Sequence, residues 1–215
     1  MADFDARALP EAIRRRIDGL TYTTDSLGRS GDTVVLLEKQ LMLKISPDKD
    51  RLAREKEKLD WLNSRLPCAQ PILFCEEGDL AYFLRTYVEG DSLTDARFLR
   101  HPALLVELLS KAISLLRALD GAHCPFSSTD NAGDGFVHGD LCLPNILISP
   151  DNEIAGYIDL DNAGRGDPWY DYAWALWSLA YNLQTRDYGA ALLARIGVPF
   201  SEEKFNRYIP AEYRT

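Results

Sequence analysis

The sequence predicts an α+β fold with two lobes, a small N-terminal lobe rich in strands and a mainly helical C-terminal lobe. Several short apolar runs before residue 89 are bounded by turn-forming residues, as strands are. Residues 102–121 instead carry an apolar stripe at helical spacing. The turn-rich run Glu89–Ser92 interrupts both patterns. We therefore place residues 1–88 in the first lobe and residues 89–215 in the second.

The composition is that of an ordinary globular protein. Of the 215 residues, 46% are hydrophobic, which is enough for one sizeable core or for two small lobes that share a cleft. The net charge of −9 argues against a nucleic-acid or membrane partner, and it suits either a cationic small-molecule ligand or solubility alone. The first residues lack the apolar segment of a secretory signal, and the four cysteines lack metal-like pairing. We expect a cytoplasmic protein with no obligate protein partner.

The strands of the first lobe are predicted from four apolar runs. Residues 33–38 and 40–45 flank a short turn and predict a hairpin, and residues 72–75 and 81–88 predict two further strands. The loop SLGRSGD, which contains Ser30, precedes the hairpin. Small residues in such a loop let backbone N–H groups approach a phosphate, although an ordinary turn explains them equally well.

A helix is predicted between the hairpin and the third strand. Ser46 can cap it, Pro47 suits its first position, and Pro67 ends it. Glu55 falls on the same face as the leucines of this helix, and a buried carboxylate requires a cationic partner. Lys44, at the end of the preceding strand, is the candidate partner. The alternative is that Glu55 reaches solvent at the edge of the stripe.

A second hairpin carries the candidate chemistry. Residues 146–148 and 154–160 flank the turn sequence SPDN. If the hairpin closes at this turn, Asn145 and Asp159 meet at its open end, and Asp140 lies in the loop just before it. Carboxylate and amide oxygens suit Mg²⁺, and a further carboxylate can take the proton of an attacking hydroxyl. The alternative is a solvated acidic turn.

Five motifs occur along the chain in a familiar order: LMLKI (41–45), REKEKLDWLNSRLP (54–67), HGDLCLPN (138–145), IDL (158–160) and GRGDPWYD (164–171). Together they resemble the aminoglycoside 3′-phosphotransferases, which have a protein-kinase-like fold. The third motif also has the His-x-Asp-x-x-x-x-Asn spacing of a kinase catalytic loop. The resemblance covers nearly the whole chain.

The resemblance implies transfer of the γ-phosphate of ATP, or of GTP, to a hydroxyl of a small molecule, with Mg²⁺ as cofactor and an aminoglycoside antibiotic as the first candidate acceptor. Asp140 would be the catalytic carboxylate, and Asn145 and Asp159 would bind the metal. The implied nucleotide contacts are Lys44 at the α- and β-phosphates, Glu55 holding Lys44, Ser30 over the phosphates, Met42 against the base, and the backbone near Thr86 and Val88 at the adenine edge.

Two further residues of these motifs are expected to support the catalytic loop. The resemblance implies that His138 braces the loop by hydrogen bonds rather than transferring protons. Asp171 would do the same, or would only stabilise the first turn of the helix that follows. The aromatic residues between 169 and 181 are expected to pack in the core and in a cleft wall rather than to form a stacking platform.

The chain departs from the family pattern where the acceptor would bind. Between Gly90 and His138 there is room for one long helix and a loop, so the family's additional helical segment is missing. Tyr181 and Asn182 stand where an acidic pair is expected, whereas Glu212 is retained. These departures favour two alternatives: a kinase of another small metabolite alcohol, or a non-catalytic kinase-like nucleotide-binding protein. The second is disfavoured because none of the catalytic positions is lost.

Overall fold

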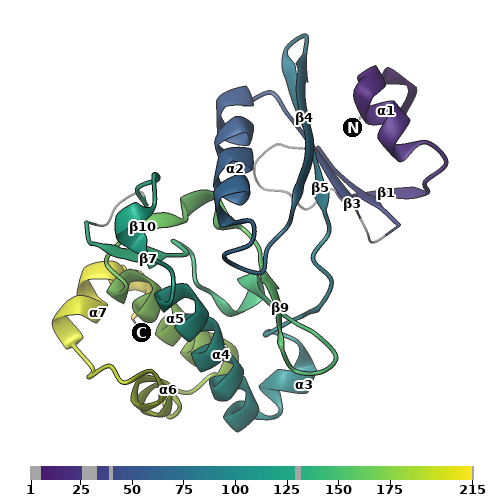
Figure 1. Cartoon of the computed structure of the whole chain (residues 1–215). Coiled ribbons are helices and arrows are strands. Elements are labelled where there is room, and N and C mark those ends of the chain that lie inside the picture. The colour runs from purple at the N-terminus through teal and green to yellow at the C-terminus, as the bar shows by residue number, and fades with distance from the viewer. Residues whose placement is uncertain (1–5, 26–32, 39–40, 129–131, 215) are drawn as a thin grey trace. The chain divides into compact units, whose positions relative to one another are not determined.

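The protein has the predicted α+β fold, with a β-sheet in its N-terminal part and most of its helices in its C-terminal part (Figure 1). The computed structural model describes residues 6–25, 33–38, 41–128 and 132–214. The chain divides into two compact units. The first comprises Met1–Asn63 and Cys68–Glu89, and the second comprises Ser64–Pro67 and Gly90–Thr215.

The first unit is built on a five-stranded antiparallel sheet with the order β1-β2-β3-β5-β4. Its strands are β1 (Tyr22–Asp25), β2 (Thr33–Leu37), β3 (Leu41–Ser46), β4 (Pro71–Glu77) and β5 (Leu80–Thr86). Four of these match the predicted strands with small shifts of their ends, and β1 adds an edge strand that the sequence did not reveal. The order places β3 directly beside β5, so that residues far apart in the sequence become neighbours.

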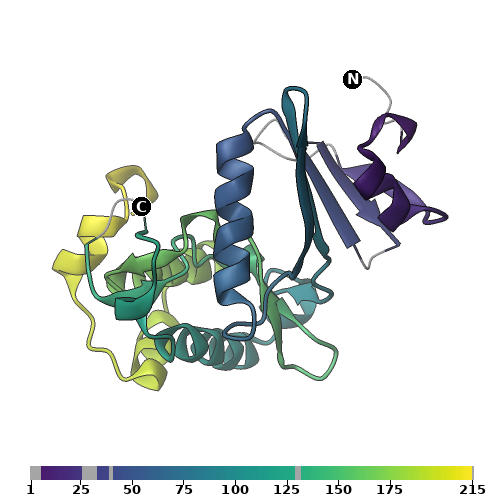
Figure 2. The same ribbon diagram turned by 45° about the horizontal axis from the view of Figure 1, so that its top comes forward.

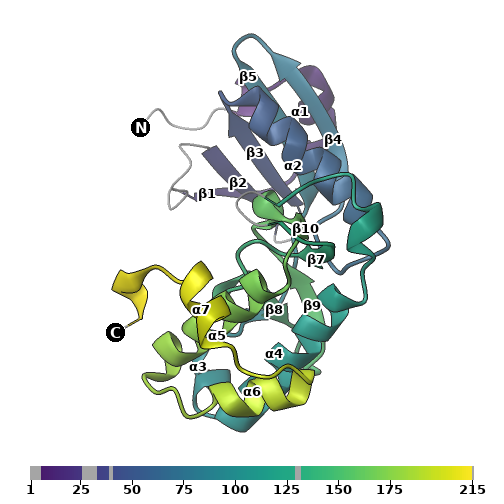
Figure 3. The same cartoon turned by 90° about the vertical axis from the view of Figure 1, so that its left-hand side faces the viewer.

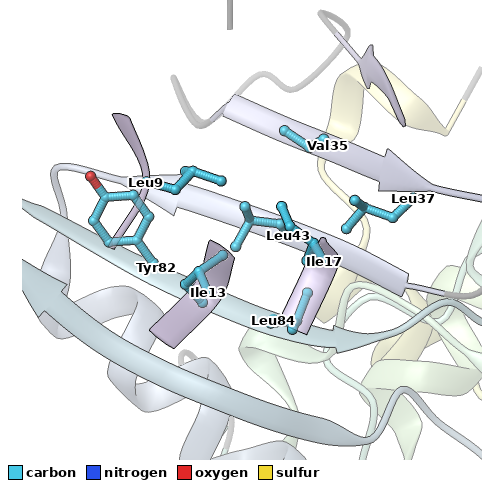
Figure 4. Close-up of a cluster of buried hydrophobic side chains, with 8 residues drawn as sticks. All are labelled: Leu9, Ile13, Ile17, Val35, Leu37, Leu43, Tyr82 and Leu84. Carbon is cyan, nitrogen blue, oxygen red and sulfur yellow. The ribbon is translucent and has the colours of Figure 1, made fainter. Parts of the chain in front are cut away.

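Helices cover both faces of this sheet (Figure 2). On one face, Ile13 and Ile17 of α1 (Glu11–Ile17) pack into a buried cluster (Figure 4). The sheet contributes to that cluster the side chains of Val35, Leu37, Leu43, Tyr82 and Leu84. Successive side chains of a strand point to opposite faces. Lys44, the residue after Leu43, therefore points toward the other face, which α2 covers.

Helix α2 (Lys49–Leu62) starts later and ends earlier than predicted. Asp48, not Ser46, is its cap, because the Asp48 carboxylate accepts the amide of the residue three positions on at 3.0 Å. Ser46 still belongs to β3, and its hydroxyl accepts the Asp48 amide at 3.1 Å. The helix ends before Pro67, because Asn63 already has a non-helical ψ of 133°. The prediction of Ser46 as cap and Pro67 as stop was therefore wrong.

The second unit contains α3 (Ala96–Leu99), α4 (Pro102–Arg117), α5 (Trp169–Leu183), α6 (Gly189–Ile196) and α7 (Glu202–Tyr208), as Figure 3 shows. The predicted helix after residue 102 is α4, which ends at Arg117 rather than at Gly121. Helices α6 and α7 each pack on α5, and α4 packs on α6. Within the described ranges, no helix has both the length and the apolar character that crossing a membrane requires.

Short strands in the second unit position the motifs HGDLCLPN (138–145) and IDL (158–160). The predicted hairpin is present as β8 (Ile146–Ile148) paired with β9 (Ile154–Tyr157), and the Ser149 amide donates to the Glu153 carbonyl at 2.9 Å across the turn. Strand β6 (Asp91–Ser92) pairs with the other edge of β8. A separate pair, β7 (Gly135–Val137) and β10 (Gly164–Gly166), brackets the stretch that contains all three catalytic candidates.

Candidate active site

The first unit holds a buried ion pair between β3 and α2. The Lys44 ammonium lies 2.9 Å from both carboxylate oxygens of Glu55. The side chains are 13% and 5% exposed, respectively, so neither charge is solvated as it would be in water. The pairing predicted from the helical stripe is therefore present, and the solvent-exposed alternative for Glu55 is excluded.

Arg85 is a third member of this charged cluster, and the sequence did not reveal it. Its Nη1 lies 3.2 Å from Glu55 Oε1, and its side chain is 9% exposed. Arg85 reaches Glu55 because β5 lies beside β3, with Arg85 opposite Met42 in the register. Lys44 and Arg85 together bring two positive charges to one carboxylate. The surplus positive charge suits an anion such as a phosphate group.

The remaining nucleotide candidates lie along the same part of the first unit. The sulfur of Met42 accepts a hydrogen bond from Arg85 Nη2 at 3.3 Å. The Thr86 amide donates to the Gln70 carbonyl at 2.9 Å, so this amide is already occupied. Val88 follows the end of β5 by two residues and makes no backbone hydrogen bond within the described ranges. Ser30 lies outside the residues that the structure describes.

The candidate catalytic loop, HGDLCLPN (138–145), is held by the start of α5. The buried Asp171 carboxylate accepts the amides of His138 at 2.7 Å and Gly139 at 3.0 Å. Gly139 has a φ of 81°, and a Cβ there would lie 2.4 Å from the Asn162 carbonyl oxygen, so the loop requires glycine at this position. Burial raises the pKa of Asp171 to about 7, although the two amide hydrogen bonds oppose this effect. Asp171 thus braces the loop, which was one of the two roles considered for it.

A second contact from α5 holds the far end of the loop. The Leu143 amide donates to the Ser178 hydroxyl at 2.9 Å, and this hydroxyl is buried. Ser178 lies seven residues after Asp171, which places both side chains on the same face of α5. Sequence periodicity places Ser178 on that face, but the amide that it accepts comes from a distant part of the chain.

Asp140 and Asn145 are brought into direct contact. Asn145 Nδ2 donates to the Asp140 carbonyl at 2.9 Å and to Asp140 Oδ2 at 3.0 Å. Asp140 is half-buried, whereas Asn145 is buried. Because Nδ2 is committed to Asp140, Oδ1 is the Asn145 atom that can bind a cation. The contact fixes the Asp140 carboxylate before any substrate is bound.

Asp159 lies at the open end of the hairpin, as predicted. The Ile158 amide donates to the Asn145 carbonyl at 3.1 Å, so the two arms are still joined one residue before Asp159. Asp159 is exposed and has a left-handed backbone, with φ 57° and ψ 50°. Such a conformation is uncommon for a residue other than glycine, although Asp tolerates it better than most. Strained backbone of this kind often marks a functional position.

The donor set at this end of the hairpin fits Mg²⁺. It offers the amide oxygen of Asn145 and the carboxylate of Asp159, and Mg²⁺ typically takes one or two protein carboxylates or carbonyls and completes its shell with waters and phosphates. Among the described residues, no group of three or more His, Cys, Asp or Glu side chains could hold a metal ion. The set is therefore unlike a closed structural metal site, which supplies all its own ligands.

His138 supports the loop differently from the prediction. Its ring is fully buried, and neither ring nitrogen has a hydrogen-bond partner among the described residues. Burial lowers the pKa of His138 to about 4, so the ring is neutral at pH 7. The ring packs against Tyr157 with 6.0 Å between centroids. His138 thus braces the loop through its backbone amide, which donates to Asp171, and through its packing.

The chain is similar to known phosphotransferases along most of its length. The profile of the family described as "Phosphotransferase enzyme family" matches residues 21–133 and 131–206. An aminoglycoside 3′-phosphotransferase from Niallia circulans is 25% identical, with 94% of this chain and 96% of that protein covered. The chain is shorter than such relatives, in keeping with the missing segment between Gly90 and His138.

Solved structures share the fold. A type VIII aminoglycoside-3′-phosphotransferase matches with a TM-score of 0.73 at 25% identity, covering 92% of this chain and 94% of that one. The aminoglycoside phosphotransferase APH(3″)-Id from Streptomyces rimosus, in complex with ADP and streptomycin, matches with a TM-score of 0.75 at 20% identity, covering 91% and 93%. The family profile spans most of the chain and the fold agrees, so this protein belongs to the phosphotransferase enzyme family and resembles its aminoglycoside 3′-phosphotransferases.

Proposed function

We propose that this protein transfers the γ-phosphate of ATP to a hydroxyl of a small molecule. The hydroxyl oxygen forms a bond to the γ-phosphorus while the bond from that phosphorus to the β,γ-bridging oxygen breaks, and ADP leaves. Asp140 accepts the hydroxyl proton and later releases it to solvent. This division of labour suits phosphoryl transfer, which depends on positioning and charge stabilisation.

The observation that supports this proposal most strongly is the fixed Asp140 carboxylate. Asn145 holds it at 3.0 Å, and Asp171 and Ser178 hold the backbone on both sides of it. A base that is positioned before the substrate arrives avoids reorganisation during the reaction. A solvated acidic turn would have no need of such support.

Residues of the first unit would hold the nucleotide. Lys44 would contact the α- and β-phosphates, with Glu55 orienting it and Arg85 keeping Glu55 anchored. The backbone near Thr86 and Val88 would meet the adenine edge, with Val88 the better placed because the Thr86 amide is occupied. Met42 would lie against the base, and Ser30 would cover the phosphates.

The metal ligands would be Asn145 and Asp159. When bound, Mg²⁺ would neutralise charge on the β- and γ-phosphates, which is its usual contribution in such enzymes. Asn145 would then serve two purposes, because Nδ2 orients Asp140 while Oδ1 binds the cation. A cytoplasmic location, where ATP is available, would suit this reaction.

An aminoglycoside is the first acceptor to test, because the named relatives are aminoglycoside phosphotransferases. Antibiotic resistance would then be the biological role. A kinase of another small metabolite alcohol is the second candidate. A specific observation favours it, since Tyr181 lines a cavity of the second unit where a polycation would need a carboxylate.

A coupled ADP-release assay over aminoglycosides and common metabolite alcohols tests the proposal, with ATP and GTP each supplied with Mg²⁺. We expect acceptor-dependent release with at least one hydroxyl compound, and none without an acceptor. Tight Mg²⁺-dependent nucleotide binding by calorimetry, with no release from any acceptor, would instead favour a non-catalytic nucleotide-binding protein. Absence of nucleotide binding would contradict both.

A further inference from the structure

A cavity of about 890 Å³ lies in the second unit and is lined by residues of α5, α6, α7 and the 3₁₀ turn η5 (Ala211–Tyr213). Its wall is unusually aromatic. Five aromatic side chains line it: Trp177, Tyr181, Phe200, Phe205 and Tyr213. A cavity of this size can enclose a small organic molecule, because ligand pockets typically measure about 300–1,000 Å³.

Several of these rings are exposed although they are large and apolar. Tyr181 and Phe200 are each 61% exposed, and Tyr213 is 47% exposed. Of the five large hydrophobic side chains that are exposed in the described part of the chain, three therefore line this one cavity. Scattered exposed rings are ordinary, but a cluster around a cavity indicates a surface that a ligand covers.

The rings hold one another in place. Trp177 stacks on Tyr181 with 5.2 Å between centroids and 19° between planes. Tyr213 meets Trp177 nearly edge-on, at 5.4 Å and 64°. The indole and phenol rings thus form a supported wall before any ligand binds, and a flat or hydrocarbon body can pack against it without reordering side chains.

The cavity has few charges. Among the described residues that line it, Glu212 is the acidic side chain and Arg186 is the basic one. Arg186 already has a hydrogen-bond partner, because its guanidinium donates to the Arg214 carbonyl. Asn182, next to Tyr181, donates to the Ser178 carbonyl of its own helix at 2.8 Å. One carboxylate can pair with one ammonium, and every further ammonium placed here would be desolvated without a partner.

The cavity wall and the catalytic loop share one helix. Ser178, which accepts the Leu143 amide of that loop, directly follows Trp177 in α5. The aromatic wall and a support of the loop are therefore adjacent residues of one helix, and this adjacency is our reason for assigning the cavity to the acceptor.

We propose that this cavity binds the acceptor alcohol, and that the acceptor carries an apolar ring and a single ammonium group. The ring packs against Trp177 and Tyr213, while Glu212 pairs with the ammonium, which the aromatic faces also attract. This inference rests on the proposed phosphotransfer and narrows it, because it makes polycationic aminoglycosides poor acceptors and favours a small monoamine alcohol.

Calorimetric binding to the intact chain tests the inference with two probes. Phenylalaninol has one aromatic ring, one ammonium and one hydroxyl, whereas kanamycin has several ammonium groups and no aromatic ring. We expect phenylalaninol to bind at least tenfold more tightly than kanamycin. Equal or tighter binding of kanamycin, or no detectable binding of phenylalaninol, would overturn the inference.

Variants of exposed positions locate the binding site. Tyr181→Glu should raise kanamycin affinity about tenfold, because it adds a carboxylate to the wall, whereas the matched control Tyr181→Phe should leave it unchanged. Glu212→Gln should weaken the binding of phenylalaninol about tenfold. The assignment would be contradicted if Tyr181→Glu did not raise the affinity for kanamycin. It would also be contradicted if Glu212→Gln left the affinity for phenylalaninol unchanged.

These outcomes separate the inference from the proposed function. If phenylalaninol binds as expected but no acceptor supports ADP release, the phosphotransfer fails, and the cavity stands only as a binding site for an aromatic monoamine. If kanamycin is both bound more tightly and phosphorylated, the phosphotransfer stands and the assignment fails.

Discussion

The two faces of α5 serve different regions of the second unit. On one face, Asp171 and Ser178 hold the backbone of the catalytic loop through buried hydrogen bonds. On the other, Trp177 and Tyr181 line a cavity with aromatic rings. The loop face matches the family's motifs, whereas the cavity face departs from them. Under the proposed function, the same helix would keep its support of the loop while its other face would select a different acceptor.

The largest effect should follow from removing the charge of Asp140. Asp140→Asn keeps an oxygen to accept the Asn145 amide, so the loop should retain its shape. We expect phosphoryl transfer to fall about 10²–10⁴-fold, because the attacking hydroxyl loses its base, while ATP binding changes little. Steady-state ADP release and calorimetry would measure both. Asp151→Asn, in the exposed turn of the same hairpin, is the control, and a parental rate for Asp140→Asn would refute the assignment.

The metal assignment predicts the next largest effect. Asp159→Asn should lower the apparent affinity for Mg²⁺ by about 10–100-fold, because a hard cation loses a charged oxygen ligand. Titration of activity with Mg²⁺ at fixed ATP measures this change, again against Asp151→Asn. If the variant and the parent required the same Mg²⁺ concentration, Asp159 would not be a ligand.

The hairpin and the Lys44–Glu55 pair could be predicted from sequence because their contacts are local. The hairpin from 146 to 157 is set by a turn and two short apolar runs, and it brings Asn145 and Asp159 to one end. Lys44 and Glu55 were likewise paired from a strand and the helix that follows it. For Asp171 the sequence leaves two roles open, bracing the loop or stabilising the first turn of α5. It cannot decide between them, because the partners of Asp171 lie more than thirty positions earlier in the chain.

Contacts set by sheet order or by competition between caps could not be predicted in this way. Arg85 joins Glu55 only because β5 is inserted next to β3, and no local pattern reveals that neighbour. Ser46 and Asp48 both suit a helix cap, and the extension of β3 through Ser46 decides between them. Helix α1 was missed because it is one short run with only two buried residues.

The support of the loop by Asp171 predicts a pH effect on stability. The pKa of Asp171 is about 7 in the folded protein against 3.8 as the ordinary value, so folding favours the protonated carboxyl. The contribution of Asp171 to the free energy of unfolding is complete below pH 3.8. It falls by up to about 1.4 kcal/mol per pH unit as the pH rises, and it is lost once the pH has passed through 7.

Asp171→Asn cannot titrate, so the comparison isolates this residue. The free energy of unfolding of the parent relative to Asp171→Asn should be larger at pH 5 than at pH 8, as measured by urea denaturation at both values. A difference that is the same at both values would contradict the raised pKa. The exposed Asp151→Asn variant should follow the parent at each pH.

The smallest effect concerns the charged cluster of the first unit. Arg85→Met removes one of the two cations on Glu55, which leaves Lys44 to serve both Glu55 and a bound phosphate. We expect the KM for ATP to rise about 5- to 10-fold, with a smaller change in kcat. Arg54→Met, on the exposed side of α2, is the control. An unchanged KM would show that Arg85 is only structural.

A crystal structure with Mg²⁺ and a non-hydrolysable ATP analogue would test the phosphotransfer account most directly. We predict a metal ion about 2.0–2.1 Å from Asn145 Oδ1 and from a carboxylate oxygen of Asp159, with the γ-phosphate beside it and facing Asp140. A nucleotide and metal bound elsewhere, with Asn145 and Asp159 contributing no ligand, would contradict it.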